Sequence, residues 1–337
     1  MQDQYEIRGW FTLFHQMRIL VTGGAGYIGS VMTDVLIDGG HHVVVIDNLQ
    51  RGHRDAVRSE AVFVEADLQD REAVASVLKT ERIDAVIHMA GDALVGESMQ
   101  NPGKYYRTNV IAGLTLLEAM EQSAVRTIVF SSTCAIYGVP DKVPIDENTP
   151  TRPVNPYGDS KLTFEHVLGW YHRAHGFRVA ALRYFNAAGA SERFGERHEP
   201  ETHLIPLVLD VAAGRRSHVT IFGDDYPTRD GTCVRDYIHV LDLADAHILA
   251  LRFLAAEAPR HVFYNLGCGG EGYSNREVVQ CVEQVTGKTI RVDIGPRRPG
   301  DPPTLVASSE KVRQELGWKP KRERLEVIVE SAWRWMK

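Results

Sequence analysis

A tyrosine and a lysine stand four residues apart in the segment NPYGDSK, residues 155–161. Asn155 and Pro156 are residue types favoured at a helix N-cap and at the first helical position, so the segment is predicted to open a helix. Tyr157 and Lys161 then share one helical face. A free phenol, with a pKa of about 10, is a poor base at neutral pH. Because a neighbouring ammonium favours the phenolate, the pair is predicted to act as a base and its activating cation.

A hydroxyl suited to the same chemistry occurs in VFSSTCAIYG. Thr133 lies just past the end of a predicted buried strand, where open α/β sheets place their ligands. Its hydroxyl can bond the substrate oxygen that Tyr157 deprotonates. The preceding Ser131 and Ser132 are interpreted as structural. His88 ends another predicted strand and is interpreted as a buried, hydrogen-bonded histidine rather than a base.

A glycine turn follows the first apolar run, in MRILVTGGAGYIGS. Gly23 permits a tight turn, Gly26 lets the backbone approach a pyrophosphate, and Gly29 lets a helix pack close to the sheet. The phosphates would then meet the N–H groups and the positive end of that helix. The strand, turn and helix together predict a dinucleotide site.

Acidic residues at two further strand ends complete this prediction. Asp47 ends the second apolar run, where its carboxylate can accept hydrogen bonds from the adenosine ribose and repel a 2′-phosphate. NAD is therefore favoured over NADP. Asp67 and Leu68 follow the third run and are predicted to hold the adenine through a hydrogen bond and an apolar contact.

These groups need a parallel sheet to position them. Strands are predicted in HHVVVIDN, AVFVEADL, DAVIHMAG, RTIVFSST and VAALRYFN, in addition to the one before the glycine turn. Helices are predicted over Tyr27–Ile37, Arg71–Lys79, Tyr105–Gln122 and from Pro156 onward. Strands alternating with helices imply right-handed crossovers, so the fold class is a Rossmann-type doubly wound α/β sheet.

The alternation loosens after Asn186, and a smaller α+β lobe is predicted. Helices are expected in LIPLVLDVAAG, VLDLADAHILALRFL and NREVVQCVEQVTG and over Ser309–Leu316 and Glu323–Trp335, with strands in HVTIFG, CVRDYIHV and VFYNLG. The predicted division is residues 1–16 as an N-terminal extension of unknown role, 17–186 as the NAD-binding domain and 187–337 as the substrate lobe. Some strands and helices are expected to be exchanged between the two lobes.

Composition excludes several classes of protein. The chain has 337 residues and a formal net charge of −6, which gives no support for nucleic-acid or anionic-membrane binding. No apolar run approaches the roughly 20 residues that span a bilayer. The four cysteines are scattered without metal-ligand spacing, so we predict no metal site, free thiols and a cytoplasmic location.

The motifs TGGAGYIGS, NPYGDSK and RYFNAAGA resemble those of the extended short-chain dehydrogenase/reductase family. VGESMQNPGKYY, YNLGCGG, RRPGDPPTLVASSEK and above all IFGDDYPTRDGTCVRDYIHVLDLADAH resemble the UDP-glucose 4-epimerases within it. The resemblance runs from about Met17 to the C-terminus. It implies reversible C4 epimerisation of UDP-glucose and UDP-galactose through a transient 4-keto sugar and tightly bound NAD.

The resemblance also implies residue roles. The catalytic group would be Thr133, Tyr157 and Lys161. Cofactor contacts would come from Gly23, Gly26, Tyr27, Ile28, Gly29, Asp47, Asn48, Asp67, Leu68, Met89, Ala90, Gly91, Asn109, Tyr157, Lys161 and Tyr184. Substrate contacts would come from Thr133, Asn186, His203, Leu204, Phe222, Arg235, Arg298, Asp301 and Leu305. Arg235 and Arg298 would grip the diphosphate, which guanidinium forks match. A homodimer is implied, through the Tyr105–Gln122 helix and the helix that begins at Pro156.

Two positions depart from the family pattern or vary within it. Asp92 and Ala93 stand where the epimerases often carry a lysine, which puts one cofactor contact in doubt. Leu305 stands where some relatives carry a tyrosine beside the sugar, so UDP-N-acetylhexosamines, or pentoses, remain alternative substrates.

The sequence argues against three other functions. A sugar-nucleotide dehydratase needs acidic residues directly after the catalytic threonine, where this chain has Cys134 and Ala135. The predicted grip on the diphosphate argues against a dehydrogenase that releases NADH. The intact set Thr133, Tyr157 and Lys161 argues against a binding protein without turnover.

Overall fold

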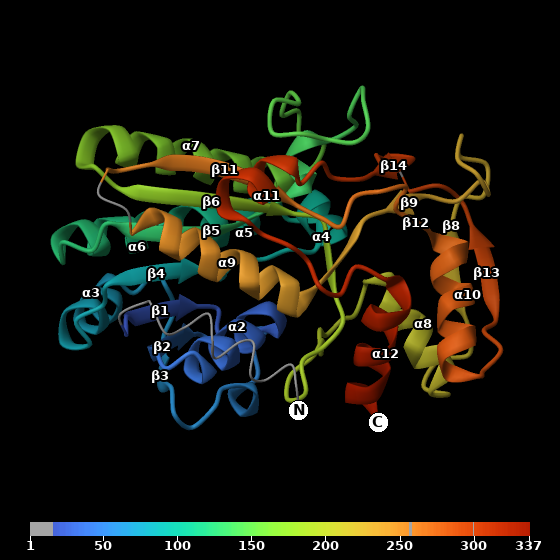
Figure 1. Ribbon diagram of the computed structural model, residues 1–337, viewed down its shortest axis with the longest axis horizontal. Helices are drawn as coiled ribbons and strands as arrows, with labels where there is room; N and C mark the ends of the chain where they lie inside the picture. Colours follow the sequence, from blue (N-terminus) through green and yellow to red (C-terminus); the bar gives the residue numbers. More distant parts are fainter. Residues whose placement is uncertain (1–15, 256–257, 299) are drawn as a thin grey trace.

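A seven-stranded sheet forms the centre of the computed structural model, which describes residues 16–255, 258–298 and 300–337 (Figure 1). Its strands are β1 (Arg18–Thr22), β2 (His42–Asp47), β3 (Val62–Glu65), β4 (Ala85–His88), β5 (Thr127–Thr133), β6 (Arg178–Tyr184) and β11 (His261–Leu266). All neighbouring strands are parallel. This confirms the predicted Rossmann-type class. The predicted N-terminal extension, residues 1–16, lies outside the described residues except for Gln16.

The strand order β11-β6-β5-β4-β1-β2-β3 contains one reversal of direction. From β1 the chain builds outward to β3, and it then returns to β4 on the other side of β1. The loops that follow β1 and β4 therefore diverge and leave a crevice at the carboxyl ends of these two strands. Open α/β sheets bind their ligands at such a switch point.

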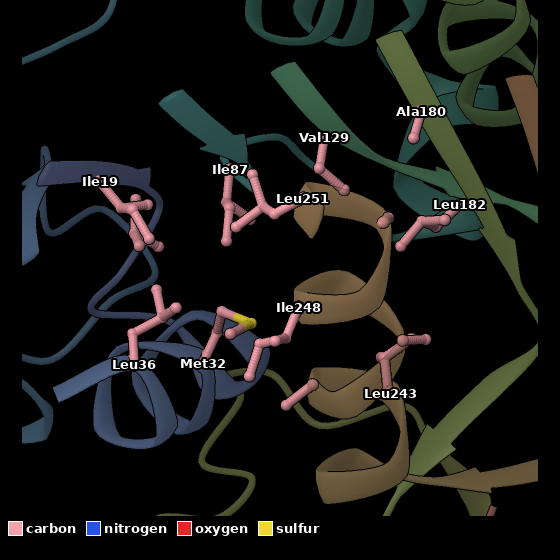
Figure 2. Close-up of a cluster of buried hydrophobic side chains, with 14 of the residues drawn as sticks. Ile19, Met32, Leu36, Ile87, Val129, Ala180, Leu182, Leu243, Ile248 and Leu251 are labelled. Carbon is pink, nitrogen blue, oxygen red and sulfur yellow. The ribbon is translucent and has the colours of Figure 1, made fainter. Parts of the chain in front are cut away.

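Helices cover both faces of the sheet because alternate strand residues are apolar on both sides. On one face, Ile19 and Val21 of β1 share a buried cluster with α2 (Tyr27–Asp38), α9 (Val240–Leu254) and α11 (Glu310–Leu316). Figure 2 shows part of this cluster, including Met32 of α2 and Leu251 of α9. On the other face, Leu20 of β1 packs with α3 (Arg71–Thr80), α6 (Ala112–Gln122) and α7 (Pro156–His175).

A second core lies at the far end of the ribbon in Figure 1, between α8 (Leu204–Ala212), α10 (Asn275–Thr286) and α12 (Leu325–Met336). It includes the parallel pair β8 (Val219–Phe222) and β13 (Val292–Gly295). Small sheets join this region to the large sheet, and their strands are β7 (Asn186–Ala188), β9 (Val234–Arg235), β10 (Tyr237–His239), β12 (Tyr273–Ser274) and β14 (Thr304–Leu305). Although α9, β11 and α11 follow Asn186 in sequence, β11 is the edge strand of the large sheet, and α9 and α11 pack on that sheet.

The single predicted helix over Tyr105–Gln122 is interrupted in the structure. It consists of α5 (Pro102–Tyr106), a π-helical turn η2 (Arg107–Ile111) and α6, and it follows the short α4 (Val95–Gln100). The π turn carries Asn109, whose buried side chain hydrogen-bonds the backbone of Asp92. A π turn adds one residue to the helix and is frequent at functional sites.

The single predicted strand in CVRDYIHV is also divided. β9 and β10 are separated by Asp236, whose buried carboxylate accepts hydrogen bonds from the backbone N–H groups of Cys268, Gly269 and Ala307 at 2.8–3.0 Å. Burial raises the pKa of Asp236 to about 6, while these three donors act in the opposite direction. One carboxylate therefore holds two remote segments, 268–269 and 307, beside Arg235.

Two short 3₁₀ turns, η1 (Arg54–Ala56) and η3 (Cys134–Tyr137), complete the helical elements of the described ranges. None of the helices in these ranges is both long enough and apolar enough to cross a bilayer.

A buried ion pair anchors α7 on the large sheet. Arg183 of β6 donates to both carboxylate oxygens of Glu165 at 3.0 and 2.6 Å, and Ser132 of β5 donates to the same carboxylate at 2.5 Å. The two charged side chains are 6% and 1% exposed. Glu165 lies one turn beyond Lys161 on α7. The three bonds therefore set how the first turns of α7 face the end of β5.

We predict that Glu165→Gln lowers the free energy of unfolding by about 3–5 kcal/mol, because it leaves the buried Arg183 guanidinium without a counter-charge. The matched control is Glu118→Gln. Glu118 pairs with Arg71 at 2.9 Å on the exposed surface, so its loss should cost at most about 1 kcal/mol. Urea unfolding of both variants checks this, and equal losses would contradict the anchoring role.

Candidate functional site

The glycine turn after β1 is shaped by close backbone contacts. Gly23 has φ +70°, and a Cβ placed on it would lie 2.7 Å from the Cα of Ala90. A Cβ on Gly29 would lie 2.1 Å from the carbonyl oxygen of Gly23. Gly26 is the N-cap of α2 and has no side chain to cap the first N–H groups of that helix. The turn therefore brings an uncapped helix N-terminus to the switch point, where an anion binds favourably.

Asp47 lies against this turn at the end of β2. One carboxylate oxygen accepts from the N–H of Ala25 at 3.0 Å and the other from that of Leu49 at 2.8 Å. Burial raises the pKa of Asp47, and the two N–H donors partly offset this effect. The structure thus holds a carboxylate beside the glycine turn, as the sequence predicted.

The residues predicted at the adenine end lie beside Asp47. Asn48 donates its side-chain amide to the carboxylate of Asp67 at 2.8 Å, and Leu68 is buried next to it. Tyr27 and Ile28 open α2 on the other side of the turn, where the Tyr27 hydroxyl donates to the carbonyl of Gly189 at 2.6 Å.

The loop after β4 joins the glycine turn to α7. Met89 and Ala90 donate their backbone N–H groups to Thr22 at 3.1 and 3.3 Å. Gly91 follows, and a Cβ on it would lie 3.3 Å from the Nζ of Lys161. The predicted dinucleotide residues and the predicted catalytic lysine are therefore neighbours.

Asn109 holds this loop in place from the π turn. Its Oδ1 accepts from the N–H of Asp92 at 2.9 Å, and its Nδ2 donates to the Asp92 carbonyl and to Ser160, both at 3.0 Å. Both donor hydrogens of the amide are thus used by the protein. Asn109 positions the loop that follows Gly91, and its predicted contact with the cofactor stays a prediction.

The three residues predicted to carry the chemistry meet at the end of β5. Asn155 caps α7 by accepting from the N–H of Gly158 at 2.9 Å, with Pro156 at the first helical position, as predicted. Lys161 donates to the carbonyl of Ser131 at 3.0 Å. The side chains of Tyr157 and Thr133 are neighbours, and Thr133 acts to lower the pKa of the phenol.

The pKa of Tyr157 departs from the sequence-based expectation. Burial raises it above its usual value, Tyr184 acts in the same direction, and Thr133 only partly offsets these effects. The protein groups alone therefore leave the phenol protonated, and the expected lowering of its pKa by Lys161 and by the positive nicotinamide of NAD⁺ stays a prediction. Burial also disfavours the charge on Lys161 and lowers its pKa to about 8.

Asp92 acts on both lysines of this region, which the sequence did not reveal. Its negative charge raises the pKa of Lys161 against the effect of burial. Its carboxylate also lies 3.3 Å from the Nζ of Lys104, which pairs with Glu97 at 2.8 Å. A lysine from α5 thus stands beside the position where the family often carries its own.

His88 is fully buried in the described structure, as predicted. Its Nδ1 is hydrogen-bonded to the Thr22 hydroxyl at 2.7 Å, and its ring stacks on Phe130. Burial lowers its pKa to about 3, so it is neutral at physiological pH.

The residues predicted to bind substrate form a second group around β9 and β14. The Arg298 guanidinium lies 3.9 Å from the centre of the Phe222 ring. Arg235 lies 3.8 Å from the carboxylate of Asp301, whose backbone N–H donates to the carbonyl of Arg298. Leu305 pairs with Arg235 across the two strands.

Asn186 and Leu204 border this group, whereas the His203 side chain faces acidic residues. Asn186 donates its amide to the carbonyl of Asp236 at 2.9 Å, next to Arg235. Leu204 opens α8 and packs on the second core. The imidazole Nδ1 of His203 instead lies 2.7 Å from Glu196.

A surface cavity of about 520 Å³ lies near the second core, lined by Arg229, Gly269, Gly270, Glu271, Glu277, Glu323 and Glu326 among others. None of the predicted site residues lines it. Its carboxylates would repel a diphosphate, so we place the candidate site at the switch point, where the residues predicted to hold the cofactor and to carry the chemistry are neighbours.

Comparison with known proteins gives a consistent result. The model of the NAD dependent epimerase/dehydratase family matches residues 19–267. The UDP-glucose 4-epimerase of Corynebacterium glutamicum is 52% identical over 94% of this chain and 95% of that protein. A crystal structure of a UDP-glucose 4-epimerase superposes with a TM-score of 0.91 at 50% identity, covering 94% of this chain and 97% of the other. The Brucella ovis enzyme in complex with NAD gives a TM-score of 0.90 at 45% identity, with the same coverages.

We predict that Gly29→Ala destabilises the protein by about 1–3 kcal/mol, because its Cβ would overlap the Gly23 carbonyl and force α2 away from the turn. Gly96→Ala in α4 is the control, since a Cβ there meets nothing within 4 Å. The control should be neutral or slightly stabilising. Denaturant unfolding compares the two, and tolerance of both substitutions would argue against the tight packing of the turn.

Proposed function

The chain belongs to the NAD-dependent epimerase/dehydratase family, and on this premise we propose that it interconverts UDP-glucose and UDP-galactose at carbon 4 of the sugar. The observation that carries the proposal is the meeting of Thr133, Tyr157 and Lys161 at the end of β5, beside the glycine turn. The protein is thus an NAD-dependent isomerase. Incubating it with UDP-galactose, without added reductant, and following UDP-glucose by NMR tests the assignment.

The glycine turn fits the proposed cofactor. A Cβ on Gly23 would fill the space against Ala90, and a Cβ on Gly29 would fill the space within the turn itself. The start of α2 offers backbone N–H groups to a pyrophosphate. Asp47 stands where a ribose hydroxyl donates and where a 2′-phosphate would be repelled. We assign the dinucleotide to Gly23, Gly26 and Gly29, with Asp47 at the adenosine ribose.

Bound NAD supplies a reversible hydride acceptor for carbon 4 of the sugar. In our proposal Tyr157 removes the proton of the 4-hydroxyl and later returns it, and Thr133 bonds the same sugar oxygen. Lys161 holds the nicotinamide ribose and favours the phenolate electrostatically. Because the protein groups alone raise the pKa of Tyr157, the base depends on a positive charge bound close to it.

The substrate lobe is proposed to hold the nucleotide while the 4-keto sugar rotates to present its opposite face. Arg235 and Arg298 would grip the diphosphate, and Phe222 and Asp301 the uridine. Their grouping around β9 and β14 supports this role. Binding energy far from carbon 4 would then retain the keto sugar without restricting rotation of the hexose. Leu305 borders the predicted sugar site and leaves more room than a tyrosine.

A dehydratase is the second candidate within the family, but the residues after Thr133 do not support it. Burial raises the pKa of the Cys134 thiol to about 12, so that this group stays protonated and is a poor base. Ala135 has no ionisable group. The elimination of water would therefore lack its acid and base at these positions.

The domain division and the assembly are also proposals. We assign residues 17–186 to NAD and 187–337 to the UDP-sugar, with α9, β11 and α11 returning to the first unit. A homodimer through the α6 and α7 region is supported by two exposed apolar side chains, Ile111 and Trp170, at 49% and 64% exposure. Four free thiols suit a reducing cytoplasm. Light scattering on the purified protein tests the dimer.

We predict that Tyr157→Phe folds and retains NAD but loses about 10²–10⁴-fold in kcat, because the proton at the sugar oxygen then has no acceptor. Tyr171→Phe makes the same chemical change farther along α7 and should keep most of the activity. A coupled assay of UDP-galactose turnover gives both rates. Wild-type turnover in Tyr157→Phe would remove this residue from the role of base.

We predict that Asp92→Asn moves the alkaline limit of kcat/KM to lower pH. Burial lowers the pKa of Lys161 to about 8, and the negative charge of Asp92 acts in the opposite direction. Removing that charge therefore lowers the pKa of Lys161 further. Lys161 would then lose its proton, and with it the activating charge, at lower pH. Asp210→Asn on α8 is the control, with an unchanged pH profile expected. An unchanged or upward-shifted limit in Asp92→Asn would contradict the coupling.

A further inference from the structure

Four side chains of the loop between β7 and α8 converge outside the catalytic group. Glu196, His198, Glu201 and His203 each offer one oxygen or nitrogen, and these four atoms lie within 4.8 Å of one another. Glu196 Oε1 lies 2.8 Å from the Nδ1 of His198 and 2.7 Å from that of His203. His203 Nδ1 also lies 2.8 Å from the Oε1 of Glu201.

The composition and spacing of this cluster match a zinc site. Zn²⁺ is bound in proteins by imidazole nitrogens and carboxylate oxygens at about 2.0–2.2 Å, usually with four ligands in a tetrahedron. Ligand atoms in such a tetrahedron lie about 3.3–3.6 Å apart. The cluster spans this range, so small side-chain movements would admit the ion. Ca²⁺ and Mg²⁺ prefer oxygen ligands, which makes two imidazoles unfavourable for them.

The two carboxylates of the cluster also favour the binding of a cation. The carboxylates of Glu196 and Glu201 are 8% and 12% exposed and face the same imidazole. Two poorly hydrated carboxylates that lie this close to one another repel, and a bound divalent cation would offset that repulsion.

The loop is also held in position by backbone hydrogen bonds to Glu201 and by contacts of residues outside the cluster. The backbone N–H groups of Thr202 and His203 donate to Glu201 Oε1 at 2.6 and 2.7 Å and orient its carboxylate. Arg51 donates to the carbonyl of Glu199 at 2.6 Å, and Arg197 pairs with Asp55 at 2.6 Å. The loop is thus attached to the segment that follows β2. Pre-positioned ligands bind a metal ion at lower entropic cost.

The cluster borders the dinucleotide cradle. The ring of His198 packs edge-on against that of Tyr27, with centroids 6.2 Å apart, and Tyr27 opens α2. His198, Tyr27 and Gly26 line one small cavity. Closure of the loop by a metal ion would therefore fix the protein wall beside the glycine turn.

We propose that Glu196, His198, Glu201 and His203 bind one Zn²⁺ ion, which fastens the loop of residues 189–203 beside the N-terminus of α2. With four protein ligands the site is structural, not catalytic. No metal site is expected from the sequence, because the cysteines lack ligand spacing and the family resemblance gives His203 a substrate contact. The signal present in the sequence is a Glu-x-His pair that occurs twice, five residues apart, in ERHEPETH.

Zinc binding to the full-length, untagged protein tests this directly. After treatment with a chelator, the protein is titrated with ZnSO₄ by calorimetry, and Co²⁺ is added separately to record the absorption bands of a tetrahedral site. One Zn²⁺ per chain is expected. Glu196→Gln and His198→Asn should each weaken binding by about 100-fold or more, since loss of groups that only orient a ligand already costs 10–100-fold. His166→Ala, an exposed histidine of α7, should bind as the wild type does.

Circular dichroism and retained NAD confirm that each variant is folded, so weakened binding cannot be confused with unfolding. Zinc should also raise the melting temperature of the wild type and of His166→Ala, and not that of Glu196→Gln. The proposal is overturned if the wild type binds no stoichiometric zinc, or if Glu196→Gln and His198→Asn bind it as tightly as the wild type. These readouts do not depend on epimerase activity.

Discussion

The buried ion pair between Glu165 and Arg183 is the interaction on which the catalytic geometry depends. Together with the bond from Ser132, it ties α7 to β5 and β6 at a point one turn beyond Lys161. Lys161 adds its own bond to the carbonyl of Ser131. Because the helix has this fixed distance and rotation, Tyr157 meets Thr133 at the strand end. A charge pair buried this deeply holds one geometry, since any shift would leave a charge without its partner.

Burial also determines the pKa values of Tyr157 and Lys161, the two residues of α7 in the proposed catalytic group. It raises the pKa of Tyr157 and lowers that of Lys161 to about 8, so that the proton is held more firmly by the phenol and less firmly by the ammonium than in water. Asp92 acts against the second effect. In the second lobe, Asp236 organises two remote segments around Arg235 by accepting three of their backbone N–H groups. Each half of the proposed site is thus positioned by one buried carboxylate: Glu165 for the catalytic group and Asp236 for the substrate residues.

The sequence by itself determined the features that depend on neighbouring residues in the chain. Helix α7 begins at the predicted cap because Asn155 and Pro156 act locally. The glycine turn was predictable because close backbone packing and a left-handed conformation tolerate only glycine at Gly23. The doubly wound sheet followed from the alternation of apolar strands with helices. The position of Thr133 in the site was predicted from the rule that open α/β sheets bind ligands at the carboxyl ends of their strands.

Only the tertiary structure decided the features that arise from contacts between distant segments. The π turn at Asn109 exists because its amide meets the backbone of Asp92, and the break between β9 and β10 because Asp236 meets three remote N–H groups. The effect of burial on the pKa of Tyr157 could not be predicted, because sequence spacing reports the nearby cation but not the extent of burial. The Glu196 cluster likewise depends on the folding of one loop onto the segment after β2, because desolvation and distance are properties of the packed chain.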